Sequence, residues 1–204
     1  MRGDGWDTVV IVASGPSLTA EQCGFITAQR DSGRCRIIAI NSSWRAVPSR
    51  DVLYACDRNW WKRYHEEAPG QAEGWTADPW SAGEYGLNLI KLRGGEGICA
   101  VPGMVHGGKN SGYQAIGLAY HFGARRIILV GYDMQHTGGK RHWHDDHPKG
   151  MGNCEGIKGW VKQFDSLPGF AKPLGIELFN ATIETAITGI ERKTLWELFN
   201  ESSA

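Results

Sequence analysis

The chain has 204 residues, and its 22 Lys and Arg residues balance 22 Asp and Glu residues, so the formal net charge is zero. This length suits one domain with its own hydrophobic core and is short for two. A neutral chain has no sequence-independent attraction to nucleic acid or to an anionic membrane. No segment approaches the roughly 20 apolar residues that span a bilayer, and the first residues lack the apolar stretch of a signal peptide. We therefore expect a cytoplasmic protein that makes no membrane contact.

Short apolar runs rich in β-branched residues predict the strands. Runs of this kind are typical of strands that are covered on both faces within a parallel sheet. They lie at 8–13, 36–40, 51–55, 126–130 and 176–179. Helices are predicted at 18–30, 113–122 and 156–167, and again near the C-terminus from about residue 190.

This alternation of strands and helices predicts an α/β fold of Rossmann-like type, with a largely parallel sheet and helices on both faces. We expect residues 1–204 to form a single domain. Residues 58–109 give no clear pattern, because Gly, Pro and Trp are frequent there, and only 86–92 and 98–101 are strand-like. Residues 134–153 form a polar loop rich in His and Gly.

In a parallel α/β sheet, ligands bind outside the carboxyl ends of the strands, and this rule selects the candidate binding residues. A turn with a glycine follows the first predicted strand, and its backbone N–H groups would suit a phosphate at a helix N-terminus. A second helix start, Asn-Ser-Gly, offers the same chemistry. Both turns are equally compatible with simple helix caps, at Ser17 and Ser111. The candidates are Ser14, Gly15, Pro16, Ser17, Asn41, Asp57, Asn110, Ser111, Gly112 and Asp133.

The loop segment His142-Trp143-His144-Asp145-Asp146-His147 matches the letters HxHxDH, the metal-binding signature of metallo-β-lactamase-type hydrolases. Those binuclear sites need further histidine ligands downstream, and no histidine follows His147. We therefore expect no metal here, although His142, His144 and His147 together remain an alternative zinc site. A loop histidine that acts as a general base is the better prediction, because imidazole titrates near neutral pH.

Several of these segments resemble one known arrangement. The letters IVASGPSL after the first strand, Asn41 after the second, and the run NSGYQAIGLAYHFGARRIILVGYDM are similar to the bacterial sialyltransferase family typified by the Campylobacter enzymes. They also resemble the related 6-hydroxymethylpterin diphosphokinase-like (MptE-like) family. One departure is Ala13, which stands where these families usually have the first glycine of the turn.

The resemblance implies a GT-A-like domain and a role for each candidate residue. The turn from Ser14 to Ser17 would surround the phosphates or ribose of a nucleotide. Asn41 and Asp57 would make polar contacts to the nucleotide, and the pair Ser111 and Gly112 would hold a cytidine nucleotide. The general base would be His144 or His147.

The resemblance thus implies a glycosyltransferase that uses a nucleotide-activated sugar, such as a CMP-sugar, and requires no cofactor. The alternative is a pyrophosphokinase that uses ATP and Mg²⁺, with Asp57 and Asp133 as metal ligands. A third class is a nucleotide-binding module without catalysis. The sequence leaves the acceptor and the oligomeric state open.

Overall fold

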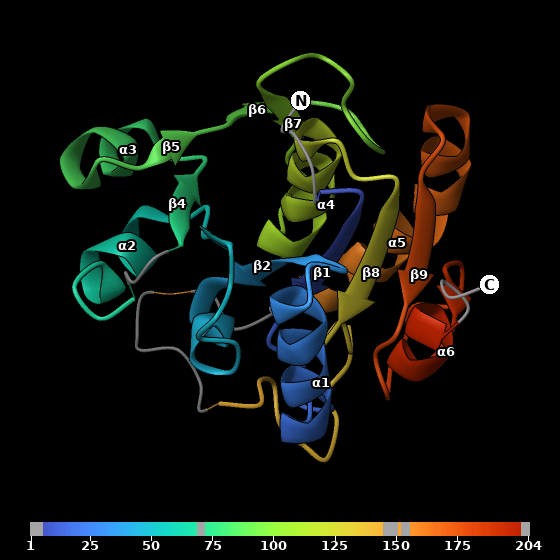
Figure 1. Ribbon diagram of the computed structural model, residues 1–204. Helices are drawn as coiled ribbons and strands as arrows, with labels where there is room; N and C mark the ends of the chain where they lie inside the picture. The colour runs from blue at the N-terminus through green and yellow to red at the C-terminus, as the bar shows by residue number, and fades with distance from the viewer. Residues whose placement is uncertain (1–5, 69–71, 145–150, 152–155, 201–204) are drawn as a thin grey trace.

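In the computed structural model, which describes residues 6–68, 72–144, 151 and 156–200, eight parallel strands form one twisted sheet (Figure 1). Their order across the sheet is β10-β9-β8-β1-β2-β3-β4-β5. The strands are β1 (Thr8–Val12), β2 (Arg36–Ile40), β3 (Val52–Tyr54), β4 (Glu73–Thr76), β5 (Asn88–Leu89), β8 (Arg126–Val130), β9 (Glu177–Asn180) and β10 (Glu191–Arg192). The prediction of a Rossmann-like α/β fold is confirmed at this level.

The strand order reverses between β1 and β8. From β1 the chain builds the sheet outward to β5, then returns, so that β8 pairs with the free side of β1 from Thr8↔Arg126 to Val12↔Val130. Such a reversal is a topological switch point, where the loops after the two central strands diverge and leave a crevice. The crevice lies after Val12 and after Val130.

Helices cover both faces of the sheet (Figure 1). The side chains of β1 alternate: Val9 and Ile11 pack on the side of α4 (Ser111–Phe122) and α5 (Ile157–Ala171). Val10 and Val12 pack on the opposite side, which is covered by three other helices. These are α1 (Ala20–Asp31), α2 (Arg58–Tyr64) and α6 (Leu195–Asn200). Each fully buried Val or Ile stabilises the fold by about 1.5–3 kcal/mol. The central strands, whose carboxyl ends border the crevice, are therefore held firmly in the core.

Side-chain caps define where the helices flanking the crevice begin. Thr19 caps α1, accepting a hydrogen bond from the N–H of Gln22 at 3.2 Å, so the helix starts two residues later than predicted and Ser17 is not its cap. Asn110 caps α4 through its Oδ1 and the N–H of Tyr113, at 3.1 Å. The choice of Ser111 as that cap is wrong, because an Asn side chain reaches the same orphan N–H from one position earlier.

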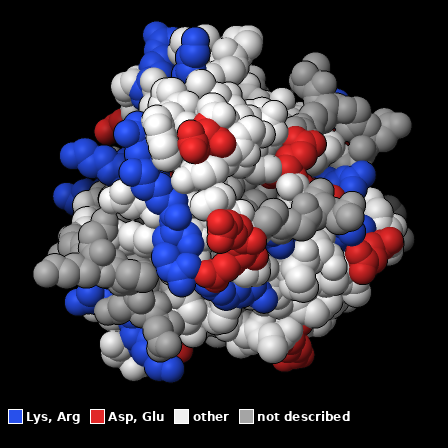
Figure 2. Space-filling model, turned by 90° about the vertical axis from the view of Figure 1, so that its left-hand side faces the viewer, with Lys and Arg blue, Asp and Glu red and all other residues white. Residues whose placement is uncertain are grey.

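The segment that gave no clear sequence pattern folds onto the edge of the same sheet. After α2 it forms β4, α3 (Pro79–Tyr85) and β5, and then β6 (Lys91–Arg93) and β7 (Met104–His106), which pair as a small parallel sheet. The predicted strand at 86–92 overlaps β5 and β6, whereas 98–101 is not a strand. Figure 2 faces this end of the molecule and shows Lys and Arg side chains in a band beside acidic ones.

The C-terminal third differs from the prediction in two places. The helix predicted to end at residue 167 continues to Ala171 although Pro168 lies inside it. Phe164, Leu167 and Ala171 share one face at helical spacing and are all buried, so their packing outweighs the hydrogen bond that the proline removes. The helix predicted from about residue 190 is preceded by the short strand β10. Within the described residues, no helix has both the length and the hydropathy required to cross a bilayer.

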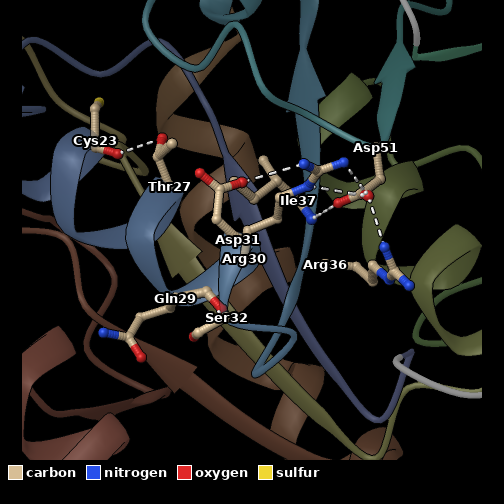
Figure 3. Close-up of polar contacts among 9 residues, drawn as sticks. All are labelled: Cys23, Thr27, Gln29, Arg30, Asp31, Ser32, Arg36, Ile37 and Asp51. Atoms are coloured by element: carbon tan, nitrogen blue, oxygen red, sulfur yellow. Dashed lines mark hydrogen bonds and ion pairs between the residues drawn. The ribbon is translucent and has the colours of Figure 1, made fainter.

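A carboxylate ties α1 to the start of β2 (Figure 3). Asp51 Oδ2 accepts the N–H of Ile37 at 2.8 Å, and Asp51 Oδ1 accepts from Arg30 at 3.0 Å and from Arg36 at 3.1 Å. The Asp51 side chain is only 9% exposed, and its hydrogen bond raises the pKa of Arg30. The tie sits at the amino ends of the strands, away from the crevice, so its role is structural.

We expect Asp51→Ala to lower the free energy of unfolding by about 2–3 kcal/mol, because it removes charge-assisted hydrogen bonds and leaves a backbone N–H without its acceptor. Urea denaturation measures the change. Asp31→Ala is the control, since Asp31 also pairs with Arg30 but is 57% exposed, and its loss should cost about 0.5 kcal/mol or less. Equal effects of the two substitutions would contradict this account of Asp51.

Candidate functional site

A cavity of about 550 Å³ opens at the carboxyl ends of β1, β2, β3 and β8 and at the start of α4. Eight of the ten predicted binding residues line it, and Pro16 and Ser17 do not. The eight are Ser14, Gly15, Asn41, Asp57, Asn110, Ser111, Gly112 and Asp133. Segments far apart in the sequence therefore meet where the strand-end rule places a ligand.

Backbone strain is concentrated around this cavity. Among the described residues, three that are not glycine have positive φ: Asn41 at 47°, Lys109 at 55° and Met134 at 48°. All three line the cavity. A left-handed residue other than glycine costs about 1–3 kcal/mol, and such residues gather at functional sites. In addition, Asn41 Oδ1 is buried and has no hydrogen-bond partner in the described structure, so it is an acceptor that a ligand donor would satisfy.

The turn after β1 is held by Asp133, at the end of β8. Asp133 Oδ2 accepts the Ser17 N–H at 2.9 Å, and Oδ1 accepts the Ser17 hydroxyl at 2.8 Å. Oδ2 also accepts the Thr137 hydroxyl at 2.7 Å. Burial raises the pKa of Asp133, and these hydrogen bonds oppose that shift. An internal carboxylate thus occupies the Ser17 donors that were predicted to serve a phosphate.

Gly15 is required by this arrangement of the chain itself. Its N–H donates to the carbonyl oxygen of Gly131 at 2.7 Å. A Cβ at position 15 would lie 2.0 Å from Asp133 Oδ1 and 2.5 Å from the Gly131 oxygen. The glycine therefore permits the close approach of the ends of β1 and β8, which forms one wall of the cavity.

The start of α4 forms another wall. Its N-terminus carries the partial positive charge that favours an anionic ligand group. The Ser111 hydroxyl lies 3.0 Å from Cys56 Sγ. Gly112 leaves room for the ring of Tyr132, whose hydroxyl donates to the Gly112 carbonyl at 3.1 Å. The lining also includes the basic residues Lys109 and Arg141.

Sequence reasoning missed Gln114, which is buried and lines the cavity one turn into α4. Gln114 Oε1 accepts the Tyr54 hydroxyl at 2.5 Å, and its Nε2 donates to the Gly107 carbonyl at 2.7 Å. These bonds join β3, α4 and the loop before α4. In the sequence, the one sign that Gln114 could belong to the site was its position, one helical turn after the Asn-Ser-Gly helix start.

The acidic residues at the cavity are mostly engaged by protein partners. Asp78 caps α3 and pairs with Arg58 at 2.9 Å, and Arg58 together with the Ser81 hydrogen bonds lowers the pKa of Asp78 to about 2. Asp57 is exposed and contacts Cys56 Sγ at 3.4 Å. Within the part of the chain that the structure describes, no three His, Cys, Asp or Glu side chains are grouped to hold a metal ion.

The described part of the histidine loop reaches the cavity through His142. Its Nδ1 lies 2.9 Å from the Ser14 hydroxyl, the residue is 6% exposed, and its ring stacks on that of His144 at 5.0 Å. His142 is among the lining residues and His144 is not. His147, the other predicted base, lies outside the described residues, as does part of the alternative three-histidine metal site. Sequence reasoning identified this loop but did not single out His142 as a base.

The fold and the cavity define a Rossmann-like α/β protein with a cavity at the switch point of its sheet. Comparisons with protein-family models, with curated proteins and with solved structures give no match to this chain. The functional argument therefore rests on the cavity and its side chains.

Proposed function

We propose that the cavity binds the nucleotide part of a nucleotide-activated sugar and that the chain transfers the sugar to an acceptor hydroxyl. The observation that carries this proposal is the meeting of the α4 N-terminus, the unsatisfied Asn41 oxygen and a buried histidine in one cavity. Its volume of about 550 Å³ lies within the range of small-molecule sites, about 300–1,000 Å³. The likeness to the bacterial sialyltransferase family favours a CMP-sugar and a GT-A-like mode of binding.

In this reaction the acceptor oxygen forms a bond to the anomeric carbon while the bond from that carbon to the nucleotide phosphate breaks. The leaving phosphate gains negative charge, and the amides at the start of α4 stabilise it together with Lys109 and Arg141. The hydroxyl proton goes to a histidine acting as general base. No metal ion takes part in these steps.

The base comes from the histidine loop. His142 is the described loop histidine that lines the cavity, and the ring of His144 stacks on that of His142. His147 lies outside the described residues and is tested by substitution. An imidazole suits the task, because its unperturbed pKa lies near the pH at which the reaction runs.

The carboxylates that line the cavity argue against the pyrophosphokinase alternative, because most of them are already bonded to other protein groups. Mg²⁺ prefers free carboxylate oxygens. Both oxygens of Asp133 accept hydrogen bonds from the protein, and Asp78 is paired with Arg58. Among the described acidic residues that line the cavity, Asp57 alone is left to bind a metal, which fits a nucleotide site without a resident metal better than an ATP–Mg²⁺ site.

Thermal denaturation with added nucleotides tests the proposal. At about 100 times its Kd, CMP or CDP should stabilise the protein by about 2.7 kcal/mol and raise Tm by about 5–10 °C. The rise should exceed that caused by ATP with Mg²⁺, and turnover of a CMP-sugar should survive chelation with EDTA. A larger shift with ATP and Mg²⁺ would instead support the pyrophosphokinase.

Asn41→Gly separates ligand binding from stability. Glycine relieves the left-handed strain at φ 47°, about 1–3 kcal/mol, but it adds about 0.5–1 kcal/mol of backbone entropy to the unfolded chain. The free protein should therefore gain about 0.5–2 kcal/mol. The variant also loses the Asn41 side-chain oxygen, so nucleotide affinity should fall about tenfold, the equivalent of one hydrogen bond. Isothermal titration and urea denaturation give the two values. A stabilised variant with unchanged affinity would remove Asn41 from the site.

A further inference from the structure

Among the described acidic residues that line the cavity, Asp57 has a carboxylate with room for further hydrogen bonds. Its Oδ2 accepts the Cys56 thiol at 3.4 Å, a weak contact because a thiol is a poor donor. Its Oδ1 accepts from no group in the described part of the chain. Although Asp57 precedes α2, its side chain makes no capping hydrogen bond to that helix. The residue is also exposed, so a ligand in the cavity can reach the carboxylate.

This carboxylate lies one side chain away from the start of α4. The Cys56 thiol that contacts Asp57 also lies 3.0 Å from the hydroxyl of Ser111, the first residue of α4. All three residues line the cavity. A phosphate held at the α4 N-terminus would therefore lie near Asp57 but would not contact it, because the two groups carry like charges. The ligand group that faces Asp57 must be an uncharged donor attached close to the phosphate.

The ribose of a nucleotide meets both requirements. It is bonded directly to the phosphate, its 2′- and 3′-hydroxyls are neighbouring donors, and the base lies beyond it. A carboxylate accepts several hydrogen bonds and donates none, so it can serve both hydroxyls at once.

We propose that Asp57 accepts hydrogen bonds from the ribose hydroxyls and that the cavity thereby selects ribonucleotides over deoxyribonucleotides. A site that bonds a ligand hydroxyl discriminates against an analogue without it, because the partner of that hydroxyl then loses its hydrogen bond. This inference rests on the proposed function. It narrows the polar contact expected of Asp57 to one part of the nucleotide, the sugar.

Isothermal titration with CMP and 2′-deoxyCMP tests the contact. The unsubstituted protein should bind CMP about 10–100-fold more tightly, the equivalent of one hydrogen bond to a charged group. Asp57→Ala should bind the two nucleotides with nearly equal affinity, and it should fold because the side chain is exposed and caps no helix. Glu66→Ala is the control, since Glu66 follows α2, is 88% exposed and does not line the cavity. That variant should keep the full preference for CMP.

Two results of this titration would overturn the proposal. One is equal affinity of the unsubstituted protein for CMP and 2′-deoxyCMP, and the other is a preference for CMP that persists in Asp57→Ala. Further ligands then identify what Asp57 binds instead. If it holds Mg²⁺ against the phosphate, EDTA weakens both nucleotides alike. If it contacts the base, Asp57→Ala changes the ratio of CMP to UMP affinity and leaves the ratio of CMP to 2′-deoxyCMP affinity as it was.

AMP and 2′-deoxyAMP separate this inference from the proposed function, because the ribose contact does not depend on the base. A preference for AMP that disappears in Asp57→Ala, in a protein that does not bind CMP, would support the ribose contact and count against transfer from a CMP-sugar. Binding of CMP without discrimination against 2′-deoxyCMP would overturn the ribose contact alone. Absence of binding by all four nucleotides would overturn both.

Discussion

We expect His142→Ala to lose about 10²- to 10⁴-fold of turnover, the usual contribution of a general base, while nucleotide affinity barely changes. The reason is that His142 lines the cavity from the side of the loop, whereas the α4 N-terminus and Asn41 line it from other elements. Loss of the imidazole removes the proton acceptor and leaves those contacts intact. Steady-state kinetics with a CMP-sugar, together with calorimetric titration of CMP, measures both quantities.

The other loop histidines complete this experiment. His144→Ala and His147→Ala test the two bases predicted from the sequence, and His136→Ala is a matched control, since His136 is exposed in the same loop and does not line the cavity. His136→Ala should keep full turnover. If His142→Ala keeps it as well, the base lies elsewhere, and a loss confined to His144→Ala or His147→Ala would identify it.

The second large effect is expected for Gly15→Val, which should abolish nucleotide binding while the overall fold survives. A Cβ at this position would overlap Asp133 Oδ1 and the Gly131 oxygen, so the ends of β1 and β8 must separate. That movement displaces the wall of the cavity and adds about 1–3 kcal/mol of packing strain. Circular dichroism reports the fold, and titration with CMP reports binding.

Gly24→Ala is the matched control, because it also adds a side chain to a glycine but should leave CMP binding unchanged. Gly24 lies within α1, and a Cβ there would meet no atom within 4 Å. Alanine is a better helix former, so the variant should gain about 0.5–1 kcal/mol of stability and bind CMP normally. Unchanged CMP affinity in a folded Gly15→Val protein would show that the approach of β1 and β8 does not shape the site.

Much of the sheet was predictable because its central strands carry a local signal. The runs at β1, β2 and β8 are apolar and β-branched, and burial on both faces demands that composition. The strands β5, β6 and β10 have two or three residues, all exposed, so they carry no such pattern. Their positions are set by pairing with neighbours, which a single sequence does not display.

For the site, the sequence predicted the location better than the roles. The strand-end rule selected Asn41, Asp57 and Asp133, which line the cavity, because the rule depends only on topology. It did not predict that Asp133 would bond Ser17, or that Ser14 would face His142, because both contacts cross more than a hundred residues. Contacts of this kind depend on which loops the folded sheet brings together.

The pairing of β1 with β8 also determines when the cavity forms during synthesis and folding of the chain. The two strands touch only after more than a hundred intervening residues have been made, which takes roughly 6–24 s at the usual rate of synthesis. Until then β1 has one open edge, and a sheet of purely parallel strands gains nothing from local pairing to hasten its closure. Neither the Ser17–Asp133 bond nor the Ser14–His142 bond exists before that moment. Ligand binding at this cavity therefore requires that the pairing of β1 with β8 is complete, and a bound nucleotide would stabilise that junction.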